Sequence, residues 1–129
     1  MIIRIAGLLP DGSTPRDGVV DDARRTINVP IGTSLDLVLS IVTPNGASVD
    51  LNGATIQFTL KKRPLEDIKI AKTGIIAGGG ATFSILPADS KNLFPGYYLW
   101  DVWFTKAGKR DAVIPLSPWL FSASATPIP

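Results

Sequence analysis

The side chains that most often carry out enzyme chemistry are missing from this sequence of 129 residues. It contains no histidine and no cysteine. Histidine is the usual general base near neutral pH and a frequent metal ligand, and cysteine supplies thiolate nucleophiles and metal ligands. Hydroxyl groups such as those of Ser13, Ser34 and Ser40 therefore have no histidine to activate them. We expect a protein that is not an enzyme and that holds no metal and no cofactor.

Two further segments contain residue types that bind ligands in other proteins. The three glycines at 78–80 are not followed by the Gly-Lys-Ser/Thr sequence and helix that a phosphate-binding loop requires. The aspartates at positions 11, 17, 21 and 22 do not have the spacing of an EF-hand calcium loop. The glycines therefore predict a hairpin turn, and the aspartates predict a solvated polar segment.

Charge and hydropathy argue against nucleic acid and membrane as partners. Thirteen basic and eleven acidic residues give a net charge of +2, which is far from the clustered basic surface that phosphate backbones require. The densest basic run, Lys61-Lys62-Arg63, fits a strand end whose charges discourage edge pairing. The apolar opening MIIRIAGLLP is too short to span a bilayer or to act as a signal sequence. We expect a soluble chain that is not exported.

The spacing of apolar residues predicts short strands. Twelve glycines and eleven prolines interrupt the chain, and such residues favour turns over long helices. Apolar and polar residues alternate in SLDLVLSIV (34–42), ATIQFTLKK (54–62) and ATFSIL (81–86), as in strands with one buried face. Turn signals such as Asn45-Gly46 separate the segments. About six to eight such strands without an amphipathic helix indicate an all-β fold, an antiparallel β-sandwich.

The domain organisation follows from where this alternation begins. Residues 1–6 could form a short strand, but the run PDGSTPRDGVVDDARR has no sustained apolar period. We therefore predict an N-terminal arm or extension over residues 1–26 and one sandwich domain over residues 27–129. A chain of this length can bury a substantial core without disulfides.

The aromatic segment YYLWDVWF (97–104) divides into two faces. Tyr98, Trp100, Val102 and Phe104 share the face that is uniformly large and apolar, which predicts that they point between the two sheets. Combined with the apolar faces of the other strands, the predicted core consists of Leu37, Leu39, Ile41, Ile56, Phe58, Leu60, Phe83, Ile85, Tyr98, Trp100, Val102 and Phe104.

The opposite face of the same segment carries Tyr97, Leu99 and Trp103, with Asp101 between them. Because a charged residue rarely points into a sandwich core, this face should look outward and form an exposed apolar strip. Such a strip indicates either a protein contact or a surface that the chain's own arm covers. Trp119, near the end of the chain, fits either the core or a contact with a neighbouring subunit.

Three segments in order carry a resemblance to a known family. They are DLNGATIQFTLKKRP (50–64), ATFSILPADS (81–90) and NLFPGYYLWDV (92–102). Together they resemble the immunoglobulin-like module of tailed-bacteriophage structural proteins, including the N-terminal domain of baseplate upper proteins. The resemblance covers about residues 27–125. It implies an immunoglobulin-like sandwich that acts as a scaffold, with no catalytic residues.

The corner that leads into the aromatic segment is also found in other sandwiches. Leu93, Pro95, Gly96 and Tyr98 resemble the loop-to-strand corner of immunoglobulin-like and fibronectin-like domains. In that corner a tyrosine hydroxyl bonds back to nearby backbone.

The resemblance implies a non-enzymatic virion structural protein, assembled in the host cytoplasm. We expect it to mediate protein–protein assembly in the tail, baseplate or fibre-attachment region. The expected partners are other virion structural proteins and further copies of the chain, as a homo-oligomer or a multi-copy assembly. The candidate interface consists of the outward strip and two basic residues of the arm: Tyr97, Leu99, Trp103, Arg24 and Arg25.

Two other functions remain open from the sequence. A capsid decoration or cement protein would use the same kind of module with an arm that bridges subunits. A carbohydrate-binding module would stack sugar rings on Tyr97 and Trp103 beside the polar group of Asp101.

Overall fold

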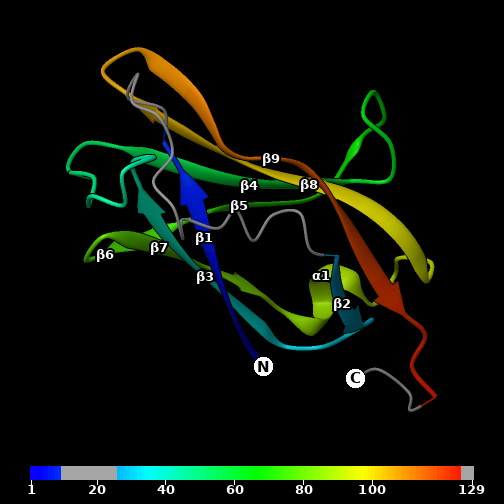
Figure 1. Ribbon diagram of the computed structural model, residues 1–129. Coiled ribbons are helices and arrows are strands. Elements are labelled where there is room, and N and C mark those ends of the chain that lie inside the picture. The colour runs from blue at the N-terminus through cyan, green and yellow to red at the C-terminus, as the bar shows by residue number, and fades with distance from the viewer. Residues whose placement is uncertain (10–25, 126–129) are drawn as a thin grey trace.

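The computed structural model describes residues 1–9 and 26–125, which form two β-sheets packed face to face (Figure 1). Sheet A has the strand order β1-β3-β7-β6 and sheet B the order β2-β9-β8-β4-β5. The strands of sheet A are β1 (Ile2–Leu8), β3 (Leu35–Val42), β7 (Gly80–Ile85) and β6 (Ile75–Ala77). Those of sheet B are β2 (Ile27–Pro30), β9 (Lys109–Ser122), β8 (Gly96–Lys106), β4 (Thr55–Lys61) and β5 (Ile68–Thr73).

The order of the strands is that of an immunoglobulin-like sandwich. In such domains, strands A, B, E and D form one sheet and C, F and G the other. Sheet A corresponds to the first set, and β4, β8 and β9 correspond to the second. The predicted all-β sandwich is therefore confirmed.

Two pairings differ from the fully antiparallel prediction. β1 pairs with β3 in parallel, and β2 pairs with β9 in parallel, so both sheets are mixed. Parallel neighbours need a long connection between them. The chain provides it, because it leaves β1 at Leu8 and enters β3 only at Leu35, after β2 has joined the other sheet.

The predicted arm over residues 1–26 is wrong for its first part. β1 spans Ile2–Leu8 and lies in register with β3, with Ile3 opposite Leu37. Ile5 of the same strand is buried in the core, and this burial ties β1 to the sandwich. The remainder of the predicted arm, residues 10–25, lies outside the described residues.

The core is built around an aromatic cluster. The ring of Phe58 lies 5.8 Å from that of Phe83, 5.8 Å from that of Trp100 and 5.7 Å from that of Trp119. All twelve residues expected in the core are buried, and Trp119 is fully buried among them rather than exposed to a neighbour. The Trp100 indole Nε1 donates to the Pro118 carbonyl at 3.2 Å, which satisfies a donor that burial would otherwise leave unpaired.

β9 is a long strand of 14 residues. The alternation of buried and exposed side chains along β9 breaks at Val113 and Ile114, which are both buried. At this point the pairing of β9 with β8 shifts register. Such bulges add a residue to one strand and bend it. Pro115 and Pro118 come before the stretch in which β2 pairs with β9, so their missing N–H groups cost no hydrogen bond to β2.

Turns and one short helix close the ends of the sandwich. The β8–β9 hairpin turns at Ala107 and Gly108, which both have positive φ, as a type I′ turn requires. The single turn α1 (Pro87–Ser90) is held to β5 by an ion pair of 2.9 Å between Asp89 and Lys72. Across residues 1–9 and 26–125, no helix is long and apolar enough to cross a bilayer.

Candidate protein interface

The predicted outward strip lies on the outer face of sheet B. Tyr97, Leu99 and Trp103 alternate along β8 with residues that are buried in the core. The Tyr97 side chain is 62% exposed, whereas Leu99 and Trp103 are half-buried. Structure and sequence therefore agree on the face, but only one of the three side chains is open to solvent. Arg24 and Arg25, the other two predicted interface residues, lie outside the described residues.

Trp103 is engaged by two polar partners. The Arg110 guanidinium carbon lies 3.7 Å from the centroid of the Trp103 ring, a cation–π contact that covers the ring. The Trp103 Nε1 donates to an Asp101 carboxylate oxygen at 3.1 Å. A sugar-binding tryptophan needs an open ring face, and Arg110 occupies one here. The same hydrogen bond gives the Asp101 carboxylate a donor, which explains how a charged residue can lie within the apolar strip.

Leu99 contributes to a shallow hollow that the sequence analysis missed. Leu116 of β9 lines the same hollow, which has a volume of about 180 Å³ and is completed by residues of β4 and the following loop. The hollow is lined by Thr59, Lys61, Pro64, Leu99, Asp101 and Leu116. Leu116 follows the bulge at 113–114, so simple alternation from the strand start could not assign its side.

The two most exposed apolar side chains lie in two different loops. Leu65, in the β4–β5 loop, is fully exposed, and Phe94, in the loop that precedes β8, is 85% exposed. We call Leu65, Phe94 and Tyr97 the apolar tip. A hollow of about 240 Å³ lies between the two loops, lined by Lys62, Glu66, Lys69, Asn92, Leu93, Phe94 and Tyr98.

Lys62, at the start of the β4–β5 loop, contacts the first residues of β8. Its Nζ donates to the Tyr97 carbonyl at 2.8 Å and lies 4.5 Å from the centroid of the Tyr98 ring. The charge of the lysine is therefore directed at a carbonyl and an aromatic face. This side chain bonds the β4–β5 loop to the start of β8.

Tyr98 fixes the backbone that presents Phe94. Its ring is buried, and its hydroxyl donates to the Phe94 carbonyl at 2.6 Å, as the tyrosine corner resemblance implied. Burial raises the pKa of the Tyr98 hydroxyl, because the charged form would lose its hydration, although the bond to Phe94 acts in the opposite direction. The phenol thus remains a neutral donor at physiological pH.

We expect Tyr98→Phe to destabilise the domain by about 1–2 kcal/mol, because it removes the hydroxyl and leaves a half-buried carbonyl without its donor. Tyr97→Phe is the matched control, since Tyr97 is exposed, and it should change the free energy of unfolding by less than about 0.5 kcal/mol. Urea denaturation of the two variants measures the difference. Equal effects would contradict the role given to the Tyr98 hydroxyl.

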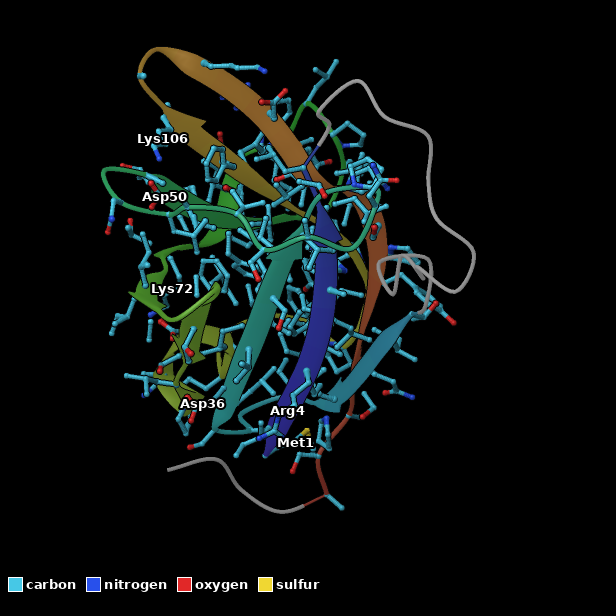
Figure 2. The ribbon with its side chains drawn as sticks, turned by 60° about the vertical axis from the view of Figure 1, so that its left-hand side comes forward. Met1, Arg4, Asp36, Asp50, Lys72 and Lys106 are labelled. Atoms are coloured by element: carbon cyan, nitrogen blue, oxygen red, sulfur yellow. The ribbon has the colours of Figure 1, made fainter. Side chains whose placement is uncertain are left out.

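The opposite end of β8 has a different character. Lys106 pairs with Asp50 at 3.6 Å (Figure 2), and the pKa of Asp50 is lowered, first by the hydrogen bond from the Asn52 amide and then by Lys106. A hollow of about 450 Å³ lies beside this pair and is partly lined by Leu9, Val49 and Phe104. An ion pair therefore lies at the C-terminal end of β8, whereas exposed apolar side chains lie near its N-terminal end.

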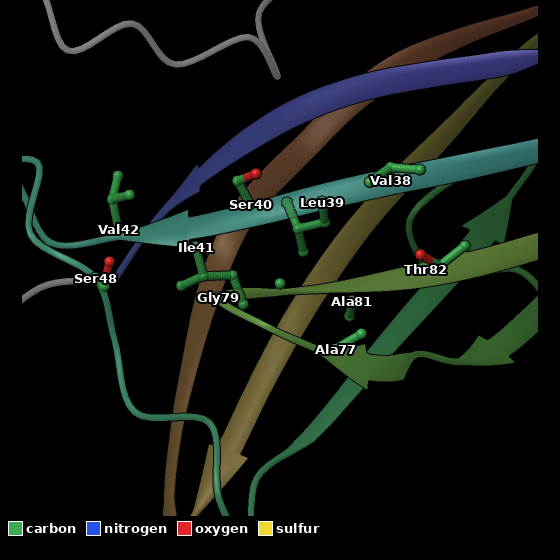
Figure 3. Close-up of a pocket in the computed structure, with 11 residues that line it drawn as sticks. Val38, Leu39, Ser40, Ile41, Val42, Ser48, Ala77, Gly79, Ala81 and Thr82 are labelled. Atoms are coloured by element: carbon green, nitrogen blue, oxygen red, sulfur yellow. The ribbon is translucent and has the colours of Figure 1, made fainter.

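The described residues that line a hollow on the outer face of sheet A include no charged side chain. A depression of about 280 Å³ lies over β3, β7 and the turn before β7 (Figure 3). Its polar side chains are the hydroxyls of Ser40, Ser48 and Thr82. Among residues 1–9 and 26–125, no group of three or more acidic residues is placed to hold a metal ion.

Comparison with known proteins gives a match in structure and none in sequence. No protein-family model matches the chain, and none of the curated proteins matches it. The solved structure of the N-terminal domain of phage TP901-1 ORF48 is similar, with a TM-score of 0.50 and 12% sequence identity. The match covers 96% of this chain and 99% of that chain. At this identity the similarity is one of fold, and at that level it agrees with the resemblance to phage structural modules.

Proposed function

We propose that this chain is a structural module of a tailed-phage particle and works by binding other virion proteins. The observation that carries the proposal is the similarity of fold to a domain of a phage protein over nearly the whole of both chains. Fold alone does not fix function. The exposed side chains of the apolar tip support a binding role, because exposed apolar surface on a folded domain often marks a protein contact.

We place the module in the tail, baseplate or fibre-attachment region, on the strength of the sequence resemblance to the N-terminal domain of baseplate upper proteins. A capsid decoration role would use the same surfaces at a different copy number. The carbohydrate alternative has less support, because Arg110 lies over the Trp103 ring on which a sugar would stack.

Copy number in purified particles tests the proposal. Quantitative mass spectrometry of particles from the encoding phage should find roughly three to a few dozen copies per particle for a tail or baseplate protein, as closed rotational symmetry requires. Hundreds of copies would instead indicate capsid decoration. Absence from purified particles would contradict a virion role altogether.

The mechanism is the burial of the apolar tip against neighbouring proteins. Tyr97 lies on strand β8, and Leu65 and Phe94 lie in loops that Lys62 and Tyr98 bond to their neighbours, so little conformational entropy is lost when they bind. Aromatic anchors of this kind often dominate the binding energy of an interface. Repeated copies around a symmetric assembly would multiply a modest affinity into stable attachment.

Phe94→Ser should reduce incorporation into particles about tenfold or more when it competes with the wild-type chain, because loss of one anchor costs at least ~1.4 kcal/mol of binding. Ile75→Ser is the matched control, since Ile75 is 73% exposed but lies on β6 of the other sheet. The ratio of variant to wild-type peptides in particles gives the result. Equal incorporation of both variants would exclude the apolar tip as the contact.

A further inference from the structure

Within residues 1–9 and 26–125, one edge of sheet A makes no hydrogen bond to a further strand. Among the described strands, β1 is the terminal strand of the sheet and pairs with β3 alone. The Asp36 amide donates to the Met1 carbonyl at 2.9 Å, and the Leu9 amide donates to the Val42 carbonyl at 2.8 Å. In a parallel ladder, alternate residues of a strand bond to the same neighbour. The backbone N–H and C=O groups of the odd-numbered residues of β1 therefore point toward β3. Those of the even-numbered residues point away from β3.

The outward residues of this edge are Ile2, Arg4, Ala6 and Leu8. Within residues 1–9 and 26–125, no hydrogen bond joins their N–H and C=O groups to another element. Figure 2 shows β1 beside β3, with Met1 and Arg4 near its start. Met1 is 59% and Ile2 58% exposed, so exposed apolar surface accompanies the open backbone.

β1 also lacks the protection that the other edge strands have. Natural sheets guard their edges with short strands, lysines, prolines or bulges. β2 and β6 have four and three residues, and β5 carries Lys69 and Lys72. β1 has seven residues, no proline and one charge, that of Arg4. A strand of this kind is suited to receive another strand.

The sequence of β1 is complementary to itself when two copies run antiparallel about Ile5. Ile2 then lies opposite Leu8 of the other copy, and Arg4 lies opposite Ala6. Antiparallel residues of the hydrogen-bonded type exchange two bonds, so the four outward residues would make about eight bonds in all. On the face toward the core, Ile5 meets its own copy and Ile3 meets Gly7, which joins the two apolar interiors along the edge.

We propose that this edge binds a second copy of the chain, through antiparallel pairing of the two β1 strands centred on Ile5. The two A sheets then form one continuous sheet across a two-fold axis. Arg4 selects this register, because a shift that centres the pairing on Arg4 would place like charges directly opposite each other. The inference concerns the purified chain and does not depend on the virion role.

Two substitutions of opposite charge at Ala6 test the pairing. Ala6→Glu places a carboxylate opposite Arg4 of the other copy, twice in each dimer, and should tighten the dimer Kd about two- to thirtyfold. Ala6→Lys places like charges there and should weaken it by a similar factor. Thr105→Glu and Thr105→Lys, at an exposed position of β8 in sheet B, are the matched controls and should leave the Kd unchanged. Analytical ultracentrifugation of the full chain measures the Kd.

Amide hydrogen exchange supplies the second readout. Protection of the Arg4, Ala6 and Leu8 amides should rise with protein concentration. A wild-type chain that stays monomeric at millimolar concentration would overturn the proposal, and so would protection of these amides in the monomer, which would mean that the chain covers its own edge. A dimer that both Ala6 variants weaken equally would overturn the proposed register.

Discussion

Phe58→Ala is expected to destabilise the domain by about 3–5 kcal/mol. The Phe58 ring touches three other aromatic rings from both sheets, and the cavity left by its removal cannot collapse without moving them. Since single domains are typically stable by only about 5–15 kcal/mol, much of the total would be lost. Urea or thermal denaturation of the purified variant measures the loss.

Phe94→Ala provides the control for that change. It removes the same atoms from a side chain that is 85% exposed, so it should shift the free energy of unfolding by no more than about 0.5 kcal/mol. If Phe94→Ala were as costly as Phe58→Ala, the aromatic cluster would not be the centre of stability.

Gly80→Ala should be nearly as damaging, with a loss of about 3 kcal/mol or more. A methyl group at Gly80 would overlap the Leu39 carbonyl oxygen and lie 2.9 Å from its carbon. These are backbone atoms of β3, the strand that pairs with β7, so they cannot rotate out of the way as a side chain would. Denaturation should show the loss, and the amides of β3 and β7 should exchange faster.

Gly79→Ala is the matched control, in the turn one residue before Gly80. No atom lies within 4 Å of the methyl group it would add, so its effect should stay below about 0.5 kcal/mol. A Gly80→Ala variant that is as stable as Gly79→Ala would show that β3 and β7 can separate at little cost.

The core could be predicted from the sequence because one rule governs it. In β4 and β8, strict alternation of apolar residues assigns each side chain to one face. The direction of pairing is different in kind. Whether β1 runs parallel or antiparallel to β3 depends on the path of the chain between them. A short apolar run such as IIRIAGL does not indicate which strand it pairs with or in which direction.

The candidate interface could be predicted only in part, for related reasons. Tyr97 follows from alternation, but Leu65 and Phe94 lie in loops, where no period indicates which side chains are exposed. The contact of Arg110 with Trp103 arises where the β8–β9 register shifts, and sequence spacing alone does not show such a shift. Leu116 was missed because of the same irregularity.

The bond from Tyr98 to Phe94 has a consequence for how this domain could diversify. The hydroxyl binds the carbonyl of residue 94, a group that every amino acid possesses. Selection on a partner can therefore replace the Phe94 side chain without loosening the loop that presents it. In related chains we expect the residue at position 94 to vary with the binding partner while the tyrosine at position 98 is kept. Binding specificity can then change without loss of stability.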